Sequence, residues 1–92
     1  MKFMSTWTVA PGTLRETVNR FLAGQGEPLE GVTLLGRWHK ADLSGGYALY
    51  ETSNLGALYE SAAAWTDLLG IHTVPVIEDA EAGPILAKVF KQ

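Results

Sequence analysis

The stretch VTLLGRWHKADLSGGYALYET, residues 32–52, decides the fold because it holds two strand-like runs with a short segment between them. The runs 32–39 and 45–52 are rich in β-branched and aromatic residues, which favour extended backbone. The intervening residues, 40–44, are too few for a crossover, so the two strands are expected to pair antiparallel. The stretch therefore predicts a β-hairpin in the middle of the chain.

One strand and one helix are predicted before the hairpin. Residues 2–9, KFMSTWTV, have strand composition and stop before Pro11. Thr13 followed by Glu16 matches a helix capping box. Apolar residues then recur at helical spacing until Gly24, at Leu14, Val18, Phe21 and Leu22.

A second helix and then a fourth strand are predicted after the hairpin. Ser53 or Asn54 can cap a second helix, which is expected to end near Gly70. Its apolar stripe consists of Leu55, Leu58, Ala62 and Trp65. Residues 71–78, IHTVPVIE, predict a fourth strand, and Pro75 places it at an edge or a bulge because proline donates no ladder hydrogen bond.

A short terminal helix is expected from about Pro84, with acidic residues before it and lysines near its end. The element order is then βαββαβ with a C-terminal helix. This is the α+β ferredoxin-like arrangement, a four-stranded antiparallel sheet with its two main helices on one face. A single domain over residues 1–92 is expected.

Composition narrows the functional classes. The net charge is −3 and the basic residues are scattered, which argues against a nucleic-acid partner. The chain has no cysteine, so disulfides, thiolate metal sites and a cysteine nucleophile are excluded. No stretch is apolar enough for a membrane span or a signal peptide. A cytoplasmic protein is expected.

Both faces of the predicted sheet carry apolar side chains. In the first strand, Phe3 and Trp7 alternate with Met4, and in the fourth, Val74 alternates with Ile71. A large exposed apolar patch usually marks an interface. The sequence therefore predicts a two-fold homodimer that packs sheet on sheet.

The hairpin also contains the candidate site. Regular alternation puts Arg37 and His39 on one face of the sheet and Trp38 on the other, where it faces the helices. Pairing His39 opposite Tyr47 then gathers Arg37, His39, Tyr47 and Glu51 on the face that the dimer covers. A slip of one residue in the turn separates them.

Such a cluster has a definite chemistry. Arg37 presents a planar cation to a carboxylate or enolate oxygen, and histidine exchanges protons near neutral pH. His39 and Glu51 are the candidate catalytic residues, with Glu51 orienting its neighbours. The candidate ligand-binding residues are Arg37, Tyr47, Trp7, Trp65 and His72. Two histidines with scattered carboxylates match no metal-ligand spacing, so no metal site is expected.

The alternative interpretation is structural. Arg37 and Glu51 would then form a cross-strand or intersubunit ion pair, with His39 at the solvated end of the hairpin. The residues alone leave both interpretations open.

Four segments carry a family resemblance: MKFMSTWTVAPGT, GVTLLGRWH, GYALYET and VIEDAEAGPILAKV. Together they resemble a family of small bacterial proteins known only as a domain of unknown function. The resemblance implies a subunit similar to the dimeric α/β barrels, which include muconolactone isomerases, antibiotic-biosynthesis monooxygenases and stress-responsive barrel proteins. These relatives commonly bind small organic molecules, often with no metal or organic cofactor.

None of the catalytic motifs of those relatives is plainly present, so the resemblance assigns no catalytic residue. It implies a dimeric barrel that binds a small organic ligand, anionic if Arg37 is its anchor, and that acts as a cofactor-independent isomerase or oxygenase. The alternative is a non-catalytic dimeric interaction or stress-associated protein. Fold resemblance alone does not choose between them.

Overall fold

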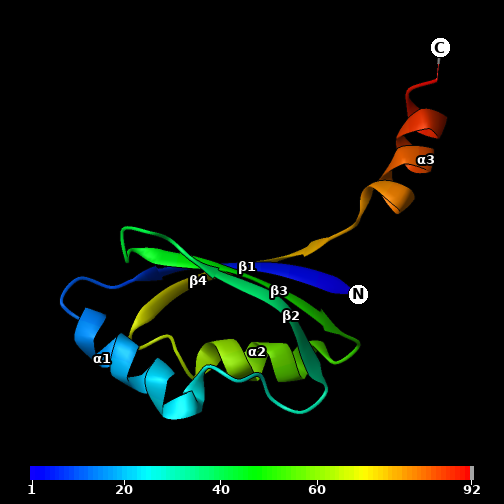
Figure 1. Cartoon of the computed structure of the whole chain (residues 1–92). Coiled ribbons are helices and arrows are strands. Elements are labelled where there is room, and N and C mark those ends of the chain that lie inside the picture. The colour runs from blue at the N-terminus through cyan, green and yellow to red at the C-terminus, as the bar shows by residue number, and fades with distance from the viewer. Residues whose placement is uncertain (92) are drawn as a thin grey trace.

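One antiparallel sheet organises the chain. The computed structural model describes residues 1–91. The four strands are β1 (Lys2–Val9), β2 (Val32–His39), β3 (Gly45–Thr52) and β4 (Leu69–Val76). They lie in the order β2-β3-β1-β4, and each adjacent pair is antiparallel (Figure 1). The predicted hairpin is confirmed, with strands at the residues expected.

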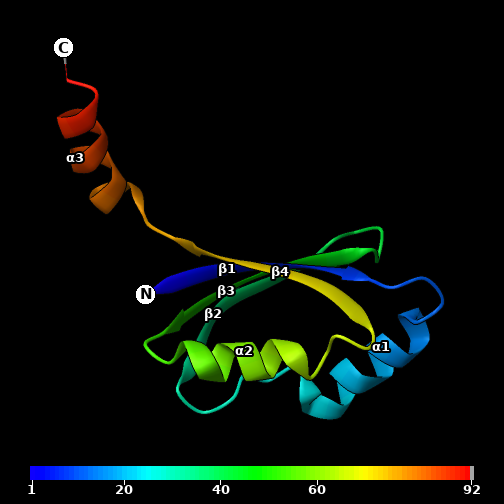
Figure 2. The same ribbon diagram turned by 180° about the vertical axis from the view of Figure 1, so that it is seen from behind.

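Helices cover only one face of this sheet. The segments α1 (Leu14–Arg20), η1 (Phe21–Gln25) and α2 (Leu55–Ala63) lie on the same side of it (Figures 1 and 2). The last helix, α3 (Asp79–Val89), projects away from both layers. This arrangement confirms the ferredoxin-like βαββαβ fold with a C-terminal helix. Within residues 1–91, no helix has the length and apolar character required to cross a membrane.

Several element ends differ from the sequence-based expectations. The Thr13 hydroxyl makes no capping bond to α1 and instead donates to the carbonyl oxygen of Ala10 at 2.8 Å. Asn54 does cap α2, because its side chain accepts from the Ala57 amide at 3.1 Å. That helix ends at Ala63, earlier than predicted, since a series of tight turns follows it and leads into β4.

The two C-terminal elements also begin earlier than predicted. Strand β4 starts at Leu69 and stops at Val76, and it is an edge strand, as Pro75 indicated. Helix α3 starts at Asp79, so Pro84 lies inside it. Asp79 and Glu81 in its first turn interact favourably with the helix dipole, which accounts for the early start.

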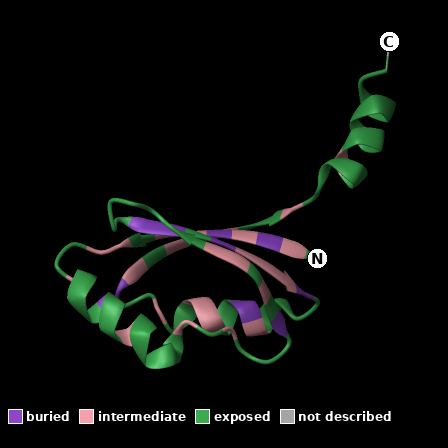
Figure 3. Cartoon of the chain, viewed as in Figure 1, coloured by how far each residue is buried: buried purple, intermediate pink, exposed green. Residues whose placement is uncertain are grey.

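The hydrophobic core is small. It consists of Phe3, Val32 and Leu58, with Tyr50 and Ala57 packed against it. Figure 3 shows that the buried residues lie mainly in the sheet, and α1 and α2 contribute one each, Thr17 and Leu58. Many large apolar side chains remain exposed within the described chain, on the uncovered face of the sheet, on all the helical segments and in loops.

Two glycines at the start of β3 permit close packing around Trp7. Gly46 pairs with Trp7 in the sheet, and a Cβ atom on Gly46 would overlap the Trp7 indole and the Trp38 carbonyl oxygen. A Cβ atom on Gly45 would overlap the Trp7 carbonyl oxygen. The glycines thus allow the Trp7 ring to lie across β3 on the helix side.

Candidate functional site

A β-bulge in β2 determines which side chains reach the helix-covered face. Leu34 pairs with Tyr50 and Gly36 pairs with Leu49, so Leu35 is an extra residue in the ladder. Such an insertion reverses the alternation of every side chain that follows it. After the bulge, Arg37 pairs with the buried Ala48.

The predicted pairing of His39 with Tyr47 is therefore wrong. His39 pairs with Gly46, and Trp38 pairs with Tyr47. Cross-strand partners share a face, so Arg37 and His39 lie on the helix side, and Trp38 lies on the uncovered side. The prediction assumed unbroken alternation along β2 and thereby placed all three residues on the wrong face.

The structure separates the predicted site residues into two groups. Arg37, His39 and Trp7 share the helix-covered face, and Trp65 faces them from beyond the end of α2. Tyr47, Glu51 and His72 lie on the opposite face. Within one chain, Glu51 can neither orient His39 nor pair with Arg37, which also contradicts a cross-strand Arg37–Glu51 ion pair.

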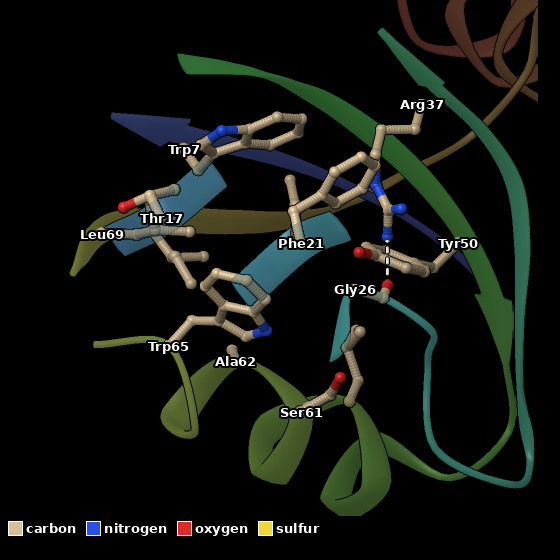
Figure 4. A pocket seen from close by; sticks show the side chains of 13 residues that line it. Trp7, Thr17, Phe21, Gly26, Arg37, Tyr50, Ser61, Ala62, Trp65 and Leu69 are labelled. Atoms are coloured by element: carbon tan, nitrogen blue, oxygen red, sulfur yellow. Dashed lines mark hydrogen bonds between the residues drawn. The ribbon is translucent and has the colours of Figure 1, made fainter. Parts of the chain in front are cut away.

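A partly open cavity of about 110 Å³ lies between the sheet and the helices (Figure 4). All four strands, α1, η1, α2 and the segments after η1 and α2 contribute to its walls. Its aromatic lining residues are Trp7, Phe21, Tyr50 and Trp65. The Tyr50 hydroxyl and the indole nitrogen of Trp65 point into it. The cavity thus combines flat apolar walls with a few hydrogen-bonding groups.

Arg37 supplies the cationic side chain of this cavity. Its Nη2 donates to the Gly26 carbonyl oxygen at 2.6 Å, and its guanidinium carbon lies 5.6 Å from the centre of the Phe21 ring. Gly26 makes this approach possible, since a Cβ atom there would press against Phe21 and approach the guanidinium. One backbone bond leaves other guanidinium N–H groups for a ligand, because arginine has five.

His39 lies beside Trp7 and Phe21, two of the aromatic residues that line the cavity. Its ring centre is 5.5 Å from that of Trp7 and 5.2 Å from that of Phe21, both edge to face. The side chain is exposed at the end of β2. His39 therefore borders the cavity through its aromatic neighbours.

Arg20 holds Trp65 in its position at the wall of the cavity. Its two terminal nitrogens donate to Asp67 at 3.0 and 2.8 Å, and its guanidinium carbon lies 5.2 Å from the centre of the Trp65 ring. The side-chain hydrogen bonds from Arg20 lower the pKa of Asp67, and those to Asp67 raise the pKa of Arg20. This ion pair joins α1 to the segment between α2 and β4.

Sequence reasoning missed part of the lining. Phe21, Tyr50, Thr17 and Ser61 were not candidates, although all four line the cavity. The Thr17 hydroxyl is buried and has no hydrogen-bond partner among the described residues. One available signal was Gly36, because a glycine within a strand often marks a bulge. With the bulge included, alternation places Leu34 and Arg37 on the same face of the sheet. Their cross-strand partners, Tyr50 and Ala48, lie on that face too.

The described residues offer no metal centre. Among residues 1–91, no three histidine or acidic side chains come together in a group able to hold a metal ion.

The family model for a domain of unknown function, DUF3303, matches residues 1–90. The chain belongs to this family. No functionally curated protein matches the chain significantly.

Two solved structures share the fold of this DUF3303 protein. One is 5-chloro-2-hydroxyhydroquinone dehydrochlorinase (TftG) from Burkholderia phenoliruptrix, in complex with 2,5-dihydroxybenzoquinone, at a TM-score of 0.56 and 14% identity over 85% of this chain and 95% of that one. The other is Rv0793 from Mycobacterium tuberculosis, at a TM-score of 0.51 and 10% identity over 86% and 97%. The similarity shows that this chain and these two proteins share a fold.

Substituting Asp67 with asparagine is expected to lower stability at neutral pH and to lose that effect in acid. The folded-state pKa of Asp67 is lowered, so its contribution is present above the unfolded value of about 3.9 and fades as the pH falls through the folded pKa. Denaturant unfolding at pH 7 and pH 3 measures the difference. Glu30→Gln removes one carboxylate charge from the exposed segment before β2 and serves as the control. An equal deficit for Asp67→Asn at both pH values would contradict the ion-pair explanation.

Proposed function

We propose that this protein binds a small planar organic anion in the cavity between the sheet and the helices. The observation that carries the proposal is the Arg37 guanidinium at a cavity walled by aromatic rings. Ligand sites are typically apolar and aromatic, with a few polar groups that fix orientation. Arg37 binds the anionic oxygen, and Tyr50 and Trp65 offer hydrogen bonds to the rest of the ligand.

The cavity volume limits the ligand to about one ring. At about 110 Å³ it is somewhat smaller than the cavity of about 150 Å³ that holds benzene in an engineered protein. Because the cavity is partly open, substituents can extend beyond it. A carboxylated or hydroxylated six-membered ring fits these limits.

The similarity to TftG adds support from a protein of the same fold. That structure contains 2,5-dihydroxybenzoquinone, a single planar ring with acidic oxygens. At 14% identity the similarity carries no residue roles, so the ligand class here rests on the shape and charge of this cavity.

Substituting Arg37 with alanine is expected to abolish ligand-induced stabilisation. The probes are benzoate, salicylate and 2,5-dihydroxybenzoquinone, with benzamide as a neutral analogue, and the measurement is thermal unfolding. A ligand that binds only the folded protein, at a hundred times its Kd, stabilises by about 2.7 kcal/mol. We expect the anions to raise the Tm of the native protein and to leave that of Arg37→Ala unchanged.

Lys40→Ala is the matched control, since it removes one positive charge next to the uncovered face, where the Lys40 amino group lies 5.6 Å from the centre of the Tyr47 ring. This variant should retain the full shift. Equal shifts in Arg37→Ala, or shifts produced equally well by benzamide, would refute an anion anchor at Arg37.

We infer that His39, which borders the cavity through Trp7 and Phe21, exchanges a proton with the part of the ligand that extends out of the cavity, in a cofactor-independent isomerisation or oxygenation. A positioned general acid or base contributes about 10²- to 10⁴-fold to a rate. With any converted probe, His39→Ala should bind normally and lose turnover to that extent. His72→Ala, which alters a histidine on the opposite face, should not.

Product analysis by mass spectrometry, with and without air, checks both variants. Binding with no conversion by the native protein would identify a small-molecule-binding protein without catalysis.

A homodimer is the second part of the proposal. The uncovered face of the sheet exposes large apolar side chains, among them Trp38, Tyr47 and Val74. Exposed apolar patches of this kind usually mark interfaces. Sheet-on-sheet packing of two copies covers this face and leaves both cavities accessible on the outer sides.

Substituting Trp38 with glutamate is expected to convert the dimer to monomer at tens of micromolar. The added charge would be buried without a partner between two sheets, which is strongly unfavourable. Light scattering during size-exclusion chromatography measures the mass. Leu43→Glu, at the exposed hairpin tip, is the control and should remain dimeric. A native protein that is monomeric at this concentration would refute the dimer.

A further inference from the structure

Helix α3 has an apolar stripe that no other element within residues 1–91 covers. Ala82, Ile85, Leu86 and Val89 follow the spacing of one helix face. Ile85 is 49% exposed, Leu86 54% and Val89 65%. The helix contains no buried residue, and the figures show it standing clear of the sheet and of the other helices (Figures 1–3).

Helix α3 is also too weak to stand alone in water. It has 11 residues, whereas isolated helices shorter than about 12–15 residues are marginal. Gly83 and Pro84 lie in its interior, and both residue types weaken helices. Pro84 has no N–H to donate to the Ala80 carbonyl. A helix of this composition needs a surface to pack against.

A matching surface exists at the opposite end of the helix layer from α1. An apolar groove of about 660 Å³ runs between α2 and the sheet, lined chiefly by Met1, Phe3, Leu55, Leu58, Tyr59 and Pro75. Met1, Leu55 and Tyr59 are 60–76% exposed. The groove is distinct from the aromatic cavity, although Leu58 and Ala62 contribute to both.

The geometry of the linker directs α3 away from its own groove. Lys2 lies on the uncovered face of the sheet, where its amino group forms an ion pair with Glu78 just before α3. The helix accordingly rises on the side opposite α2 (Figure 1). To enter its own groove, α3 would have to break this pair and cross the sheet edge.

We propose that α3 is an exchanged arm whose apolar stripe packs into this groove on a second copy of the chain. The inference rests on the proposed sheet-on-sheet dimer. Packed sheets lie about 10 Å apart, and an 11-residue helix is about 16 Å long. An arm rising from one sheet therefore passes the partner's sheet and reaches its helix layer.

Charge and symmetry favour the same occupant. Lys88 flanks the stripe near the C-terminal end of α3, and the exposed Glu60 is the sequence neighbour of Tyr59, which lines the groove. Opposite charges across an interface favour the correct partner. Two-fold symmetry lets each arm fill the other groove, which closes the assembly at two chains.

Disulfide trapping tests the arm directly, because the chain has no cysteine of its own. Leu86→Cys and Tyr59→Cys are prepared as two separate full-length variants, one of them labelled with nitrogen-15, then mixed and oxidised. A disulfide forms only when the Cα atoms come within about 7 Å. We expect the mixed disulfide, identified by its intact mass. Leu86→Cys mixed with Leu43→Cys, which places the second thiol at the hairpin tip, should give none.

Three other outcomes overturn the proposal. A dimer by light scattering with no mixed disulfide leaves the sheet-on-sheet dimer intact and rejects the arm. A third variant carries Leu86→Cys and Tyr59→Cys in the same chain. An intramolecular disulfide in this variant, without cross-linking in the mixture of single variants, shows that α3 folds onto its own groove. A monomeric native protein rejects both the arm and the dimer.

Hydrogen exchange on the unsubstituted protein gives an independent measurement. Residues 79–89 should exchange slowly at concentrations where the dimer forms, and much faster on dilution to monomer. Fast exchange of α3 in a dimer whose sheet is protected would reject the arm.

Discussion

The single extra residue in β2 is the constraint on which the site depends. Leu35 interrupts the ladder, and the strand resumes with its faces reversed. Without the insertion, Arg37 and His39 would lie on the uncovered face and Trp38 would occupy the space between sheet and helices. The cavity would then lose its cation, and a second large indole would fill much of its volume. The one-residue bulge thus decides whether the space between sheet and helices is filled by the Trp38 side chain or remains a cavity.

The cavity also depends on contacts that hold its walls apart. Arg20 connects α1 to Asp67 and lies against Trp65, while Arg37 connects β2 to the backbone at Gly26. Both arginines thereby join the sheet or α1 to a segment on the far side of the cavity. The buried hydrophobic core is concentrated around Phe3, Val32 and Leu58. The packed core and the cavity are therefore adjacent in the same layer, and Leu58 and Tyr50 contribute to both.

Sequence patterns were sufficient for the architecture because they report local preferences. Branched and aromatic runs located β1, β2 and β3 at their observed ends, and Asn54 was one of two predicted caps for α2. Trp7, Trp65 and Arg37, which were all candidate ligand-binding residues, line one cavity, although Arg37 was expected on the uncovered face. The prediction of the site was wrong where it depended on the pairing register between β2 and β3. Alternation carries no information across an unrecognised insertion, so Tyr47 and Glu51 were grouped with Arg37.

The predicted caps and ends of the helices differ from the observed ones for a related reason. Thr13 and Glu16 match a capping box, yet the Thr13 hydroxyl bonds to the Ala10 and Leu68 carbonyls, and the second of these is distant in sequence. The extent of α3 depends on acidic residues near its start outweighing an internal proline. Such competitions are decided by tertiary geometry, which a local pattern does not contain.

The bulge in β2 also affects the tendency of the protein to aggregate. β2 and β4 are the two edge strands, and each contains a feature that disrupts a regular row of hydrogen-bonding groups: the bulge at Leu35 in one and Pro75 in the other. Exposed, regular edges recruit further strands and lead to aggregation. With both edges irregular, the sheet resists open-ended growth into fibrils, even though its apolar face remains available for pairing.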